Sequence, residues 1–395
     1  MKILFISTHD YRGGAAKVAY NLCSEMNDRG VEAFMYVKYK TQNNPWIIES
    51  TTPFLIKKLQ HLIDYLPMYL STTKQPISFQ FFGENLEGII KKLKPDIINF
   101  HWTGKGFVSF KEVNKIAKII PTVWTLHDQA FFQSGYFFGN NNKNLNFFTK
   151  LIEKNKIKYA NQKIYFIAPS IFMKNVFSKN KFFKENRLFL ISNGHKIMKN
   201  PEKDKIKACL NTNKNQKIVL FGGVNFVSDK IKGFKFLKAL LENESNFIEK
   251  KDVFFVSFGN ENPFEQLSIK AKNYRYLGFI SNEKLINQLF TIADIFVLPS
   301  EIENFPTVAI EAITNGTPVL AFDTGGNKEI IKHKKTGYLA KKNDINDFSY
   351  GFEYLLTNKV NIEKEEKNKF SLGKQTDDYL KLFKKIVDNY RSSSD

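Results

Sequence analysis

Two glutamates could act together because they stand eight positions apart, Glu303 just before a predicted helix and Glu311 within it. A rise of ~1.5 Å per residue puts them on the order of 10–12 Å apart. A glycosidase acid/base pair needs ~5–9.5 Å, so this spacing argues against hydrolysis by two carboxylates. It suits a clamp that holds an elongated ligand at both ends. The alternative interpretation is that both glutamates are surface residues of an ordinary helix.

The start of the same helix could hold the middle of such a ligand. Asn304 is the expected N-cap, and Pro306 is expected in the first turn, where its missing N–H costs little. Gly316 closes the helix and Pro318 prevents its continuation. Unpaired N–H groups and the helix dipole at Asn304–Pro306 would favour an anion such as a diphosphate. A nucleotide sugar has this layout, with sugar hydroxyls, a diphosphate and ribose hydroxyls in sequence.

Short apolar runs alternate with longer amphipathic ones, which predicts an α/β fold with parallel sheets. The expected strands are residues 2–7, 32–37, 96–100, 122–126, 164–168 and 188–192, followed by 217–221, 253–258, 295–298 and 319–322. The polar stretch 193–216 is the expected linker, so we predict domains of residues 1–195 and 196–376, with a helix at 377–390 that packs back on the first. Ligands of open α/β sheets bind beyond the carboxyl ends of the strands, so a cleft where the two sheets face each other is the expected binding site.

The residues around the two glutamates also carry a family resemblance. They are Pro299-Ser300, Glu303-Asn304-Phe305-Pro306, Glu311-Ala312, Gly316-Thr317-Pro318-Val319, Gly325-Gly326 and Glu329. This run resembles the E-x7-E region of retaining GT-B glycosyltransferases of the group 1 (GT4) type. The resemblance implies a GT-B fold of two Rossmann-like domains that face a central cleft. It also implies that Glu303 contacts the donor sugar, that Glu311 contacts the ribose, and that Asn304, Phe305 and Pro306 belong to the donor site.

A second segment, residues 217–234, resembles the family's strand, glycine turn and Lys-Gly pair. The resemblance implies that Lys232 neutralises the donor diphosphate. The family usually has an arginine a few residues earlier for the same task, and none stands here. Lys230 could substitute for it, although a lysine lacks the bidentate fork of an arginine.

Two further segments bear on the donor. Residues 276–280 resemble the family stretch that contacts the nucleotide base through its backbone, which brings Phe279 to the donor site. Gly13 and Gly14 open the first predicted helix, where the family places backbone N–H groups near the phosphates. A structural turn would explain this glycine pair equally well. The pair is not part of a GxGxxG sequence, so a nicotinamide cofactor is not supported.

Three histidines, His9, His101 and His127, each follow the end of a predicted strand. They could hold a zinc ion, although the family resemblance implies that no metal or other cofactor is needed. The segment that contains His127 and Asp128 resembles the family's active-site histidine segment, which implies that His127 lies beside the donor sugar and the reacting carbon. His101 and Trp102 resemble a second cleft element of surface-polysaccharide transferases. We therefore take His101, Trp102 and Asp128 as candidates for the acceptor side.

Residues 53–82 match the family least. One helical face there is apolar and lies beside lysines; its residues are Leu55, Leu59, Leu62, Ile63 and Leu66. We expect this helix to face the core, and contact with a membrane interface or with a lipid-linked acceptor is the alternative. An aromatic stretch could line the acceptor mouth or simply pack; its residues are Phe131, Phe132, Tyr136, Phe137 and Phe138.

The chain has 395 residues, with 59 Lys and Arg against 39 Asp and Glu and a formal net charge of +20. Lysines make up nearly all of the basic residues, so compositional drift and a functional basic surface both stay open. Nucleic-acid signatures such as arginine forks are absent from the sequence, and no nucleic-acid partner is expected. Two cysteines, both expected to be buried, favour a reducing compartment. We expect a cytoplasmic protein, with a peripheral contact to the inner face of the cell membrane left open.

Together these patterns predict a two-domain enzyme that transfers a hexose from a nucleotide diphosphate sugar to a growing surface glycan or glycolipid, of the lipopolysaccharide, capsule or O-antigen type. Retention of anomeric configuration follows from the family resemblance. Two alternatives stay open. One is a catalytically inactive, basic module of the same fold that binds an anionic membrane or RNA. The other is a nucleotide-sugar epimerase of the same fold.

Overall fold

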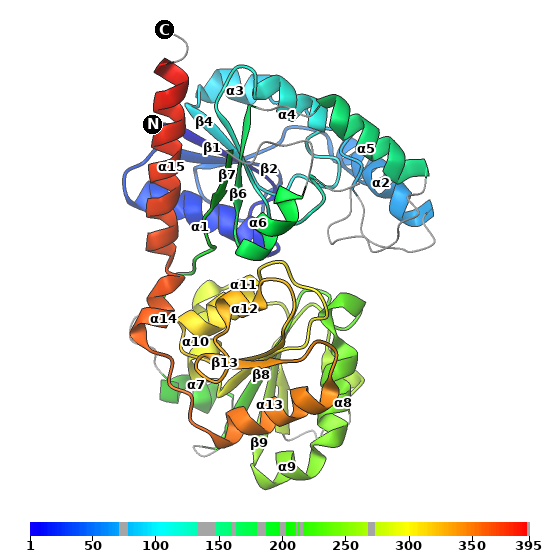
Figure 1. Cartoon of the computed structure of the whole chain (residues 1–395), viewed down its shortest axis with the longest axis vertical. Coiled ribbons are helices and arrows are strands. Elements are labelled where there is room, and N and C mark those ends of the chain that lie inside the picture. The colour runs from blue at the N-terminus through cyan, green and yellow to red at the C-terminus, as the bar shows by residue number, and fades with distance from the viewer. Residues whose placement is uncertain are drawn as a thin grey trace. The chain divides into compact units, whose positions relative to one another are not determined.

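The computed structural model describes residues 1–70, 78–132, 147–159, 163–179, 187–197, 203–210, 212–213, 216–267 and 273–392. The chain divides into two compact units (Figure 1). Unit 1 comprises Met1–Ser192 with Gln375–Asp395, and unit 2 comprises Asn193–Lys374. Each unit contains a parallel sheet. None of the described helices is long and apolar enough to cross a membrane.

The sheet of unit 1 has seven parallel strands in the order β3-β2-β1-β4-β5-β6-β7. They are β1 (Ile3–His9), β2 (Ala33–Tyr39), β3 (Ile47–Glu49), β4 (Ile97–Phe100), β5 (Thr122–Thr125), β6 (Ile164–Ala168) and β7 (Leu188–Leu190). Helices cover its faces, so the central strands are continuous apolar runs rather than alternating ones. The strand order reverses between β1 and β4, which is the place where open sheets of this kind bind ligands.

The helices of unit 1 are α1 (Gly14–Asp28), α2 (Phe54–Leu70), α3 (Glu87–Leu93), α4 (Phe110–Ile116), α5 (Phe147–Tyr159) and α6 (Ile171–Ser178). The last helix, α15 (Leu372–Ser392), begins in unit 2 and continues into unit 1. There its buried side chains, among them Tyr379 and Phe383, pack in one cluster with residues of β1 such as Phe5.

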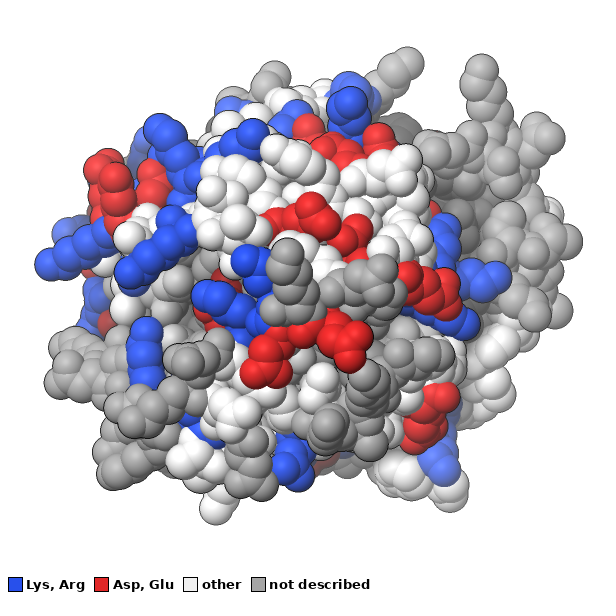
Figure 2. Space-filling model, turned by 90° about the horizontal axis from the view of Figure 1, so that it is seen from below, with Lys and Arg blue, Asp and Glu red and all other residues white. Residues whose placement is uncertain are grey.

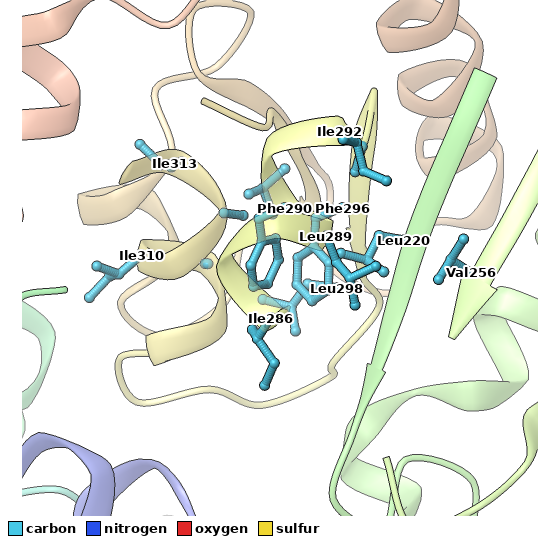
Figure 3. Packing of buried hydrophobic residues seen from close by; sticks show 14 of the residues in the cluster. Leu220, Val256, Ile286, Leu289, Phe290, Ile292, Phe296, Leu298, Ile310 and Ile313 are labelled. Carbon is cyan, nitrogen blue, oxygen red and sulfur yellow. The ribbon is translucent and has the colours of Figure 1, made fainter. Parts of the chain in front are cut away.

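The sheet of unit 2 has six parallel strands in the order β10-β9-β8-β11-β12-β13. They are β8 (Lys217–Gly223), β9 (Val253–Gly259), β10 (Tyr274–Tyr276), β11 (Ile295–Leu298), β12 (Val319–Phe322) and β13 (Gly337–Ala340). The helices are α7 (Lys203–Cys209), α8 (Phe234–Asn243), α9 (Ser245–Lys250), α10 (Glu283–Ile292), α11 (Thr307–Thr314), α12 (Asn327–Ile330), α13 (Ile345–Thr357) and α14 (Lys364–Lys369). Figure 3 shows Phe290 of α10 beside Phe296 of β11, and Ile310 of α11 belongs to the same buried cluster, which anchors the start of the loop that carries Glu303.

The α/β class with two Rossmann-like parallel sheets is therefore confirmed. Two expectations are wrong. Cys209, at the end of helix α7 within the predicted linker, is exposed rather than buried. The apolar residues of α2 do not face the core: Leu55, Leu59 and Leu62 are all exposed. Of the aromatic stretch, Phe131 and Phe132 pack in the core of unit 1. Tyr136, Phe137 and Phe138 lie outside the described residues.

Candidate active site

The loop that carries Glu303 is enclosed by two glycine turns. On one side, a Cβ added to Gly233 would lie 1.9 Å from the carbonyl oxygen of Pro299. On the other side, a Cβ at Gly325 would lie 1.5 Å from the carbonyl oxygen of Glu303. Both glycines have positive φ angles, 71° and 55°. No other residue type fits at these two positions, and the glycines hold the Glu303 backbone in a fixed place.

Glu303 and Lys232 are in direct contact. The Lys232 Nζ donates to the Glu303 Oε1 at 3.0 Å, and the Glu303 side chain is buried. Burial lowers the pKa of Lys232, but the charge of Glu303, the hydrogen bond to it and the charge of Asp229 outweigh this and raise the pKa above its usual value. Lys232 therefore stays cationic at neutral pH. The pair places an anion-binding group next to an acceptor for hydroxyl hydrogens.

Glu311 lies in the middle of α11 and is only 3% exposed. Glu303 is 7% exposed. The interpretation of both glutamates as ordinary surface residues is therefore wrong. Burying a carboxylate is costly unless partners or a function keep it there, so two buried carboxylates on adjacent segments mark this part of unit 2 as a candidate site.

The start of α11 differs from the prediction. The helix begins at Thr307, and Pro306 rather than Asn304 is the N-cap residue. The reason is a backbone contact: the N–H of Gly326 donates to the carbonyl oxygen of Asn304 at 3.1 Å, which holds Asn304 in the loop. Asn304 and Phe305 are both buried there, close to Glu303 in the chain.

The other predicted donor residues are more exposed. Lys230 is exposed on the short 3₁₀ helix Lys230–Lys232, and it is Lys232 that reaches Glu303. Phe279 is exposed and follows Gly278, whose φ is positive. In unit 1, Gly13 is the N-cap of α1, and Gly14 is its first residue. A Cβ at Gly13 would meet nothing within 4 Å, so space is open at this helix start.

Four of the predicted residues come together in unit 1. A small pocket beyond the ends of β4 and β5 is lined by His101, Trp102, His127 and Asp128, with Gln80 and Phe131 among the remaining residues. The His101 Nδ1 lies 2.8 Å from the His127 Nε2. The sequence separates these histidines by 26 positions, and the parallel pairing of β4 with β5 brings them into contact.

His9 stands apart from the other two histidines. Its ring stacks on Trp102 and Tyr39, with ring centroids 6.4 and 5.2 Å apart, and its Nε2 lies 3.1 Å from the Lys105 Nζ. Burial and the charge of Lys105 lower the pKa of His9 to about 4. Within the described ranges, no group of three or more His, Cys, Asp and Glu side chains is arranged to hold a metal ion.

A chain of buried polar groups continues from the two histidines. The Asn99 Nδ2 donates to the Thr125 Oγ1, so its Oδ1 faces the His101 Nε2 at 2.8 Å and accepts from it. Tyr379 of α15 lies 3.1 Å from the Thr125 Oγ1. Sequence reasoning missed Asn99, Thr125 and Tyr379. Asn99 could have been noticed from the sequence, because it is an asparagine inside an apolar strand and a buried amide needs hydrogen-bond partners.

This chain determines the protons on the rings. Because the His101 Nε2–H donates to Asn99, a neutral His101 must accept at Nδ1, and the His127 Nε2–H must be the donor. Burial lowers the pKa of His127 to about 3, and burial with the neighbouring His127 holds the pKa of His101 well below its usual value. Both rings are therefore neutral. Burial also raises the pKa of Asp128 to about 6.

The large positive charge does not form one field on the face shown in Figure 2. There, Lys and Arg side chains are interspersed with Asp and Glu. Several lysines form ion pairs with acidic residues, such as Lys235 with Glu301 and Lys217 with Asp294. The charge on this face therefore does not favour the alternative of a nucleic-acid-binding module.

Two protein-family models together match nearly the whole chain. Residues 202–375 match the family model of glycosyl transferases group 1, and residues 12–197 match that of Glycosyltransferase Family 4. An uncharacterized glycosyltransferase of Methanocaldococcus jannaschii is 28% identical over 163 residues, which is 40% of each chain, so the match spans less than half the length of that relative. A 41.2 kDa protein from the cps region of Klebsiella pneumoniae is 25% identical over 316 residues, 75% of this chain and 81% of that one.

A solved structure extends the likeness to the complete fold. HepE from Anabaena, in complex with UDP and glucose, superposes with a TM-score of 0.68 at 17% identity and covers 98% of this chain and 100% of its own. At this identity the match establishes the fold alone. With the two family models, which between them cover nearly the whole sequence, it leads to one assignment: the chain belongs to the group 1 glycosyltransferases and has their GT-B fold.

Proposed function

We propose that this protein is a retaining, metal-independent hexosyltransferase that moves a sugar from a nucleotide diphosphate sugar to a growing cell-surface glycan or glycolipid. The observation that carries the proposal is the Lys232–Glu303 ion pair, in which the glutamate is buried, together with Glu311 buried on the following helix. The UDP and glucose bound to HepE support a nucleotide-sugar donor. The cps-region relative supports a surface polysaccharide as the product.

On the donor side, the ammonium of Lys232 neutralises the diphosphate, as a preorganised charge placed where negative charge develops. Glu303 accepts hydrogen bonds from the sugar hydroxyls, and Glu311 accepts from the ribose. The backbone around Asn304, Phe305 and Pro306, the exposed Lys230 and Phe279, and the open α1 start at Gly13 and Gly14 complete the donor site. Glu303 must exchange part of its contact with Lys232 when the donor binds.

The transfer step is a front-face displacement. The bond between the sugar C1 and the diphosphate oxygen breaks while the acceptor oxygen bonds to C1 from the same face, and the acceptor proton passes to the departing phosphate. The positive charge that a metal would supply comes from Lys232. His127 lies beside the reacting carbon, and its Nε2–H donates to the His101 Nδ1. Trp102 and Asp128 meet the acceptor.

Thermal unfolding in the presence of nucleoside diphosphates tests the donor site. A ligand at a hundredfold excess over Kd stabilises the folded state by about 2.7 kcal/mol, and we expect at least one nucleotide of a UDP, GDP and ADP panel to raise Tm accordingly. Glu311→Gln should weaken that nucleotide by about tenfold or more, because a charged hydrogen-bond acceptor is lost.

The matched control is Glu365→Gln, which changes an exposed glutamate of α14 in the same unit and should keep the wild-type affinity. Equal affinity of the Glu311→Gln variant and the wild type would show that Glu311 does not contact the nucleotide. No shift with any nucleotide would contradict the proposed function.

A further inference from the structure

Helix α2 is attached to unit 1 through its polar side chains. Lys57 is 6% exposed and donates to the Glu49 Oε1 at 3.0 Å and to the carbonyl oxygen of Ser50 at 3.1 Å. Two turns later Asp64, 3% exposed, accepts from the Ser78 Oγ at 2.6 Å and from the Gln80 N–H at 2.7 Å. Lys57 and Asp64 are seven positions apart, so both lie on one face of the helix. This polar face is the one that contacts the protein.

The opposite side of α2 is an apolar stripe that faces solvent. Leu55, Leu59 and Leu62 are 77%, 55% and 58% exposed, and Leu66 and Tyr69 continue the stripe at 40% and 63%. Helices on a protein surface normally turn the apolar stripe to the core and the charged face to water. Helix α2 has the reverse arrangement, and no described part of the chain covers its exposed leucines.

Helix α5 adds a second exposed apolar pair next to α2. Phe147 and Leu151 are 73% and 40% exposed, one turn apart. On the inner side of α5, Ile152 is fully buried against Phe79, whose N–H donates to the carbonyl oxygen of Asp64. Both helices therefore share one end of unit 1, as Figure 1 shows. We keep the name apolar stripe for the exposed leucines and Tyr69 of α2, and Phe147 and Leu151 are a second exposed apolar pair at the same end of unit 1.

Among the described side chains of α2 and α5, the exposed charged residues are all lysines. Lys58, Lys150 and Lys154 are exposed on the two helices. The acidic residues of the two helices are Asp64 and Glu153, and of these Asp64 is buried and Glu153 half-buried. An apolar stripe flanked by lysines complements a bilayer interface whose headgroups are anionic. Two copies of this chain meeting through the stripe would bring like charges together, which argues against self-association.

We propose that helix α2, with the start of α5, docks unit 1 on the surface of an anionic lipid bilayer. The leucines enter the boundary between headgroups and acyl chains, and the lysines contact the lipid phosphates. The proposal is independent of the donor site in unit 2. It gives the exposed face a lipid partner, and it would also place a membrane-bound acceptor next to the enzyme if the proposed glycolipid substrate is correct.

Vesicle flotation of the full-length protein, without nucleotide, tests the proposal. One set of vesicles is phosphatidylcholine, and in the other roughly a quarter of the lipid is phosphatidylglycerol. We expect binding to the anionic vesicles, weakened as salt rises from about 0.05 to about 0.5 M because the lysine contacts are screened. The variant Leu55→Gln/Leu59→Gln/Leu62→Gln should reduce vesicle binding by at least about tenfold, since it removes the inserted side chains and keeps good helix formers.

The control variant, Ile119→Gln/Leu190→Gln, changes two exposed apolar residues of unit 1 outside the apolar stripe and should bind vesicles like the wild type. Light scattering and the nucleotide-dependent Tm of every variant show that folding and the donor site are intact. Equal vesicle binding of the triple variant and the wild type, or no binding to anionic vesicles by the wild type, would overturn the proposal. A wild-type dimer that the triple variant converts to a monomer would assign the stripe to a second copy and would overturn it as well.

Discussion

The ionisable side chains of the two candidate sites differ in charge: the Lys232–Glu303 pair stays charged, and the two histidines of unit 1 are neutral. In unit 2, Lys232 and Glu303 are in contact, and the pairing keeps the pKa of Lys232 high despite burial. In unit 1, burial lowers the pKa values of His101 and His127, which hydrogen-bond to each other, and His101 also hydrogen-bonds to the uncharged Asn99, so both rings are neutral. One site keeps charges by pairing them, and the other removes charges and aligns hydrogen bonds instead.

This difference matches the chemistry that each site is proposed to perform. When the bond between the sugar C1 and the diphosphate oxygen breaks, negative charge develops on the diphosphate. A fixed positive charge stabilises it, and Lys232 retains one. A reacting sugar carbon surrounded by hydroxyls needs directional hydrogen bonds without a titrating group that would compete for protons. The neutral pair in unit 1 meets that requirement over the physiological pH range.

The largest effect is expected where the charges are paired. Glu303→Gln removes the anion beside Lys232 and the acceptor for the sugar hydroxyls, and we expect transfer to fall by about 10²-fold or more. Nucleoside diphosphate binding should change much less, which initial rates and thermal shifts measure together.

The matched control is Glu301→Gln, on the same loop, where the glutamate pairs with Lys235 at 2.8 Å instead. Its transfer rate should stay close to that of the wild type. If both variants lost the same activity, the loop conformation rather than the Lys232–Glu303 pair would be responsible.

A smaller effect is expected when a carboxylate is introduced beside the neutral histidine pair of unit 1. Asn99→Asp would place a carboxylate at the His101 Nε2, raise the pKa of His101 and make its Nδ1 a donor. His127 would then accept at Nε2 and carry its proton on Nδ1. We expect a reversal of the His127 tautomer in ¹⁵N NMR spectra and roughly a tenfold loss of transfer.

Asn114→Asp makes the same change on α4 and should leave the spectrum of His127 unaltered. A wild-type spectrum in which His127 already carries its proton on Nδ1 would refute the hydrogen-bond chain described above.

The smallest expected effect is a pH-dependent change in the free energy of unfolding when Asp128 is replaced. Burial raises the pKa of Asp128 to about 6, above its value of 3.8 when unburied. Protonation of Asp128 is therefore more favourable in the folded state than in the unfolded state. It stabilises the folded state fully below about pH 4, and this stabilisation is lost as the pH rises through about 6. Asp128→Asn removes the charge of this half-buried carboxylate. It should stabilise the protein by about 1 kcal/mol near pH 7.5, after allowance for solvent screening, and not near pH 4.

Urea unfolding at several pH values measures this difference, and Asp388→Asn, at an exposed position of α15, is the control. A stabilisation that does not depend on pH would mean that Asp128 is not the titrating group.

The strands of both sheets were largely predictable, and the reason is their burial. Residues 164–168, 295–298 and 319–322 form strands with the predicted bounds, because both faces of a covered parallel strand demand apolar residues. The strands β3 and β10 have three residues each and lie at the sheet edges. A pattern of period two cannot be recognised over so few residues.

The site residues were predicted by type and motif, but their contacts were not. Lys232 and Glu303 are 71 positions apart, and contacts between their segments bring them together, among them the close approach of Gly233 to Pro299 and the hydrogen bond from the Glu301 N–H to the Ile231 carbonyl oxygen. The spacing of the leucines in α2 predicted an amphipathic helix but not which side meets the protein. The contacts of the buried Lys57 and Asp64 decide that, and their partners come from segments before and after the helix.

A crystal structure of the protein with a bound nucleoside diphosphate tests the central claim most directly. The account predicts the diphosphate within hydrogen-bond distance of the Lys232 Nζ and a ribose hydroxyl against the carboxylate of Glu311. A nucleotide bound elsewhere, with the Lys232–Glu303 contact unchanged and Glu311 remote from the ligand, would contradict it.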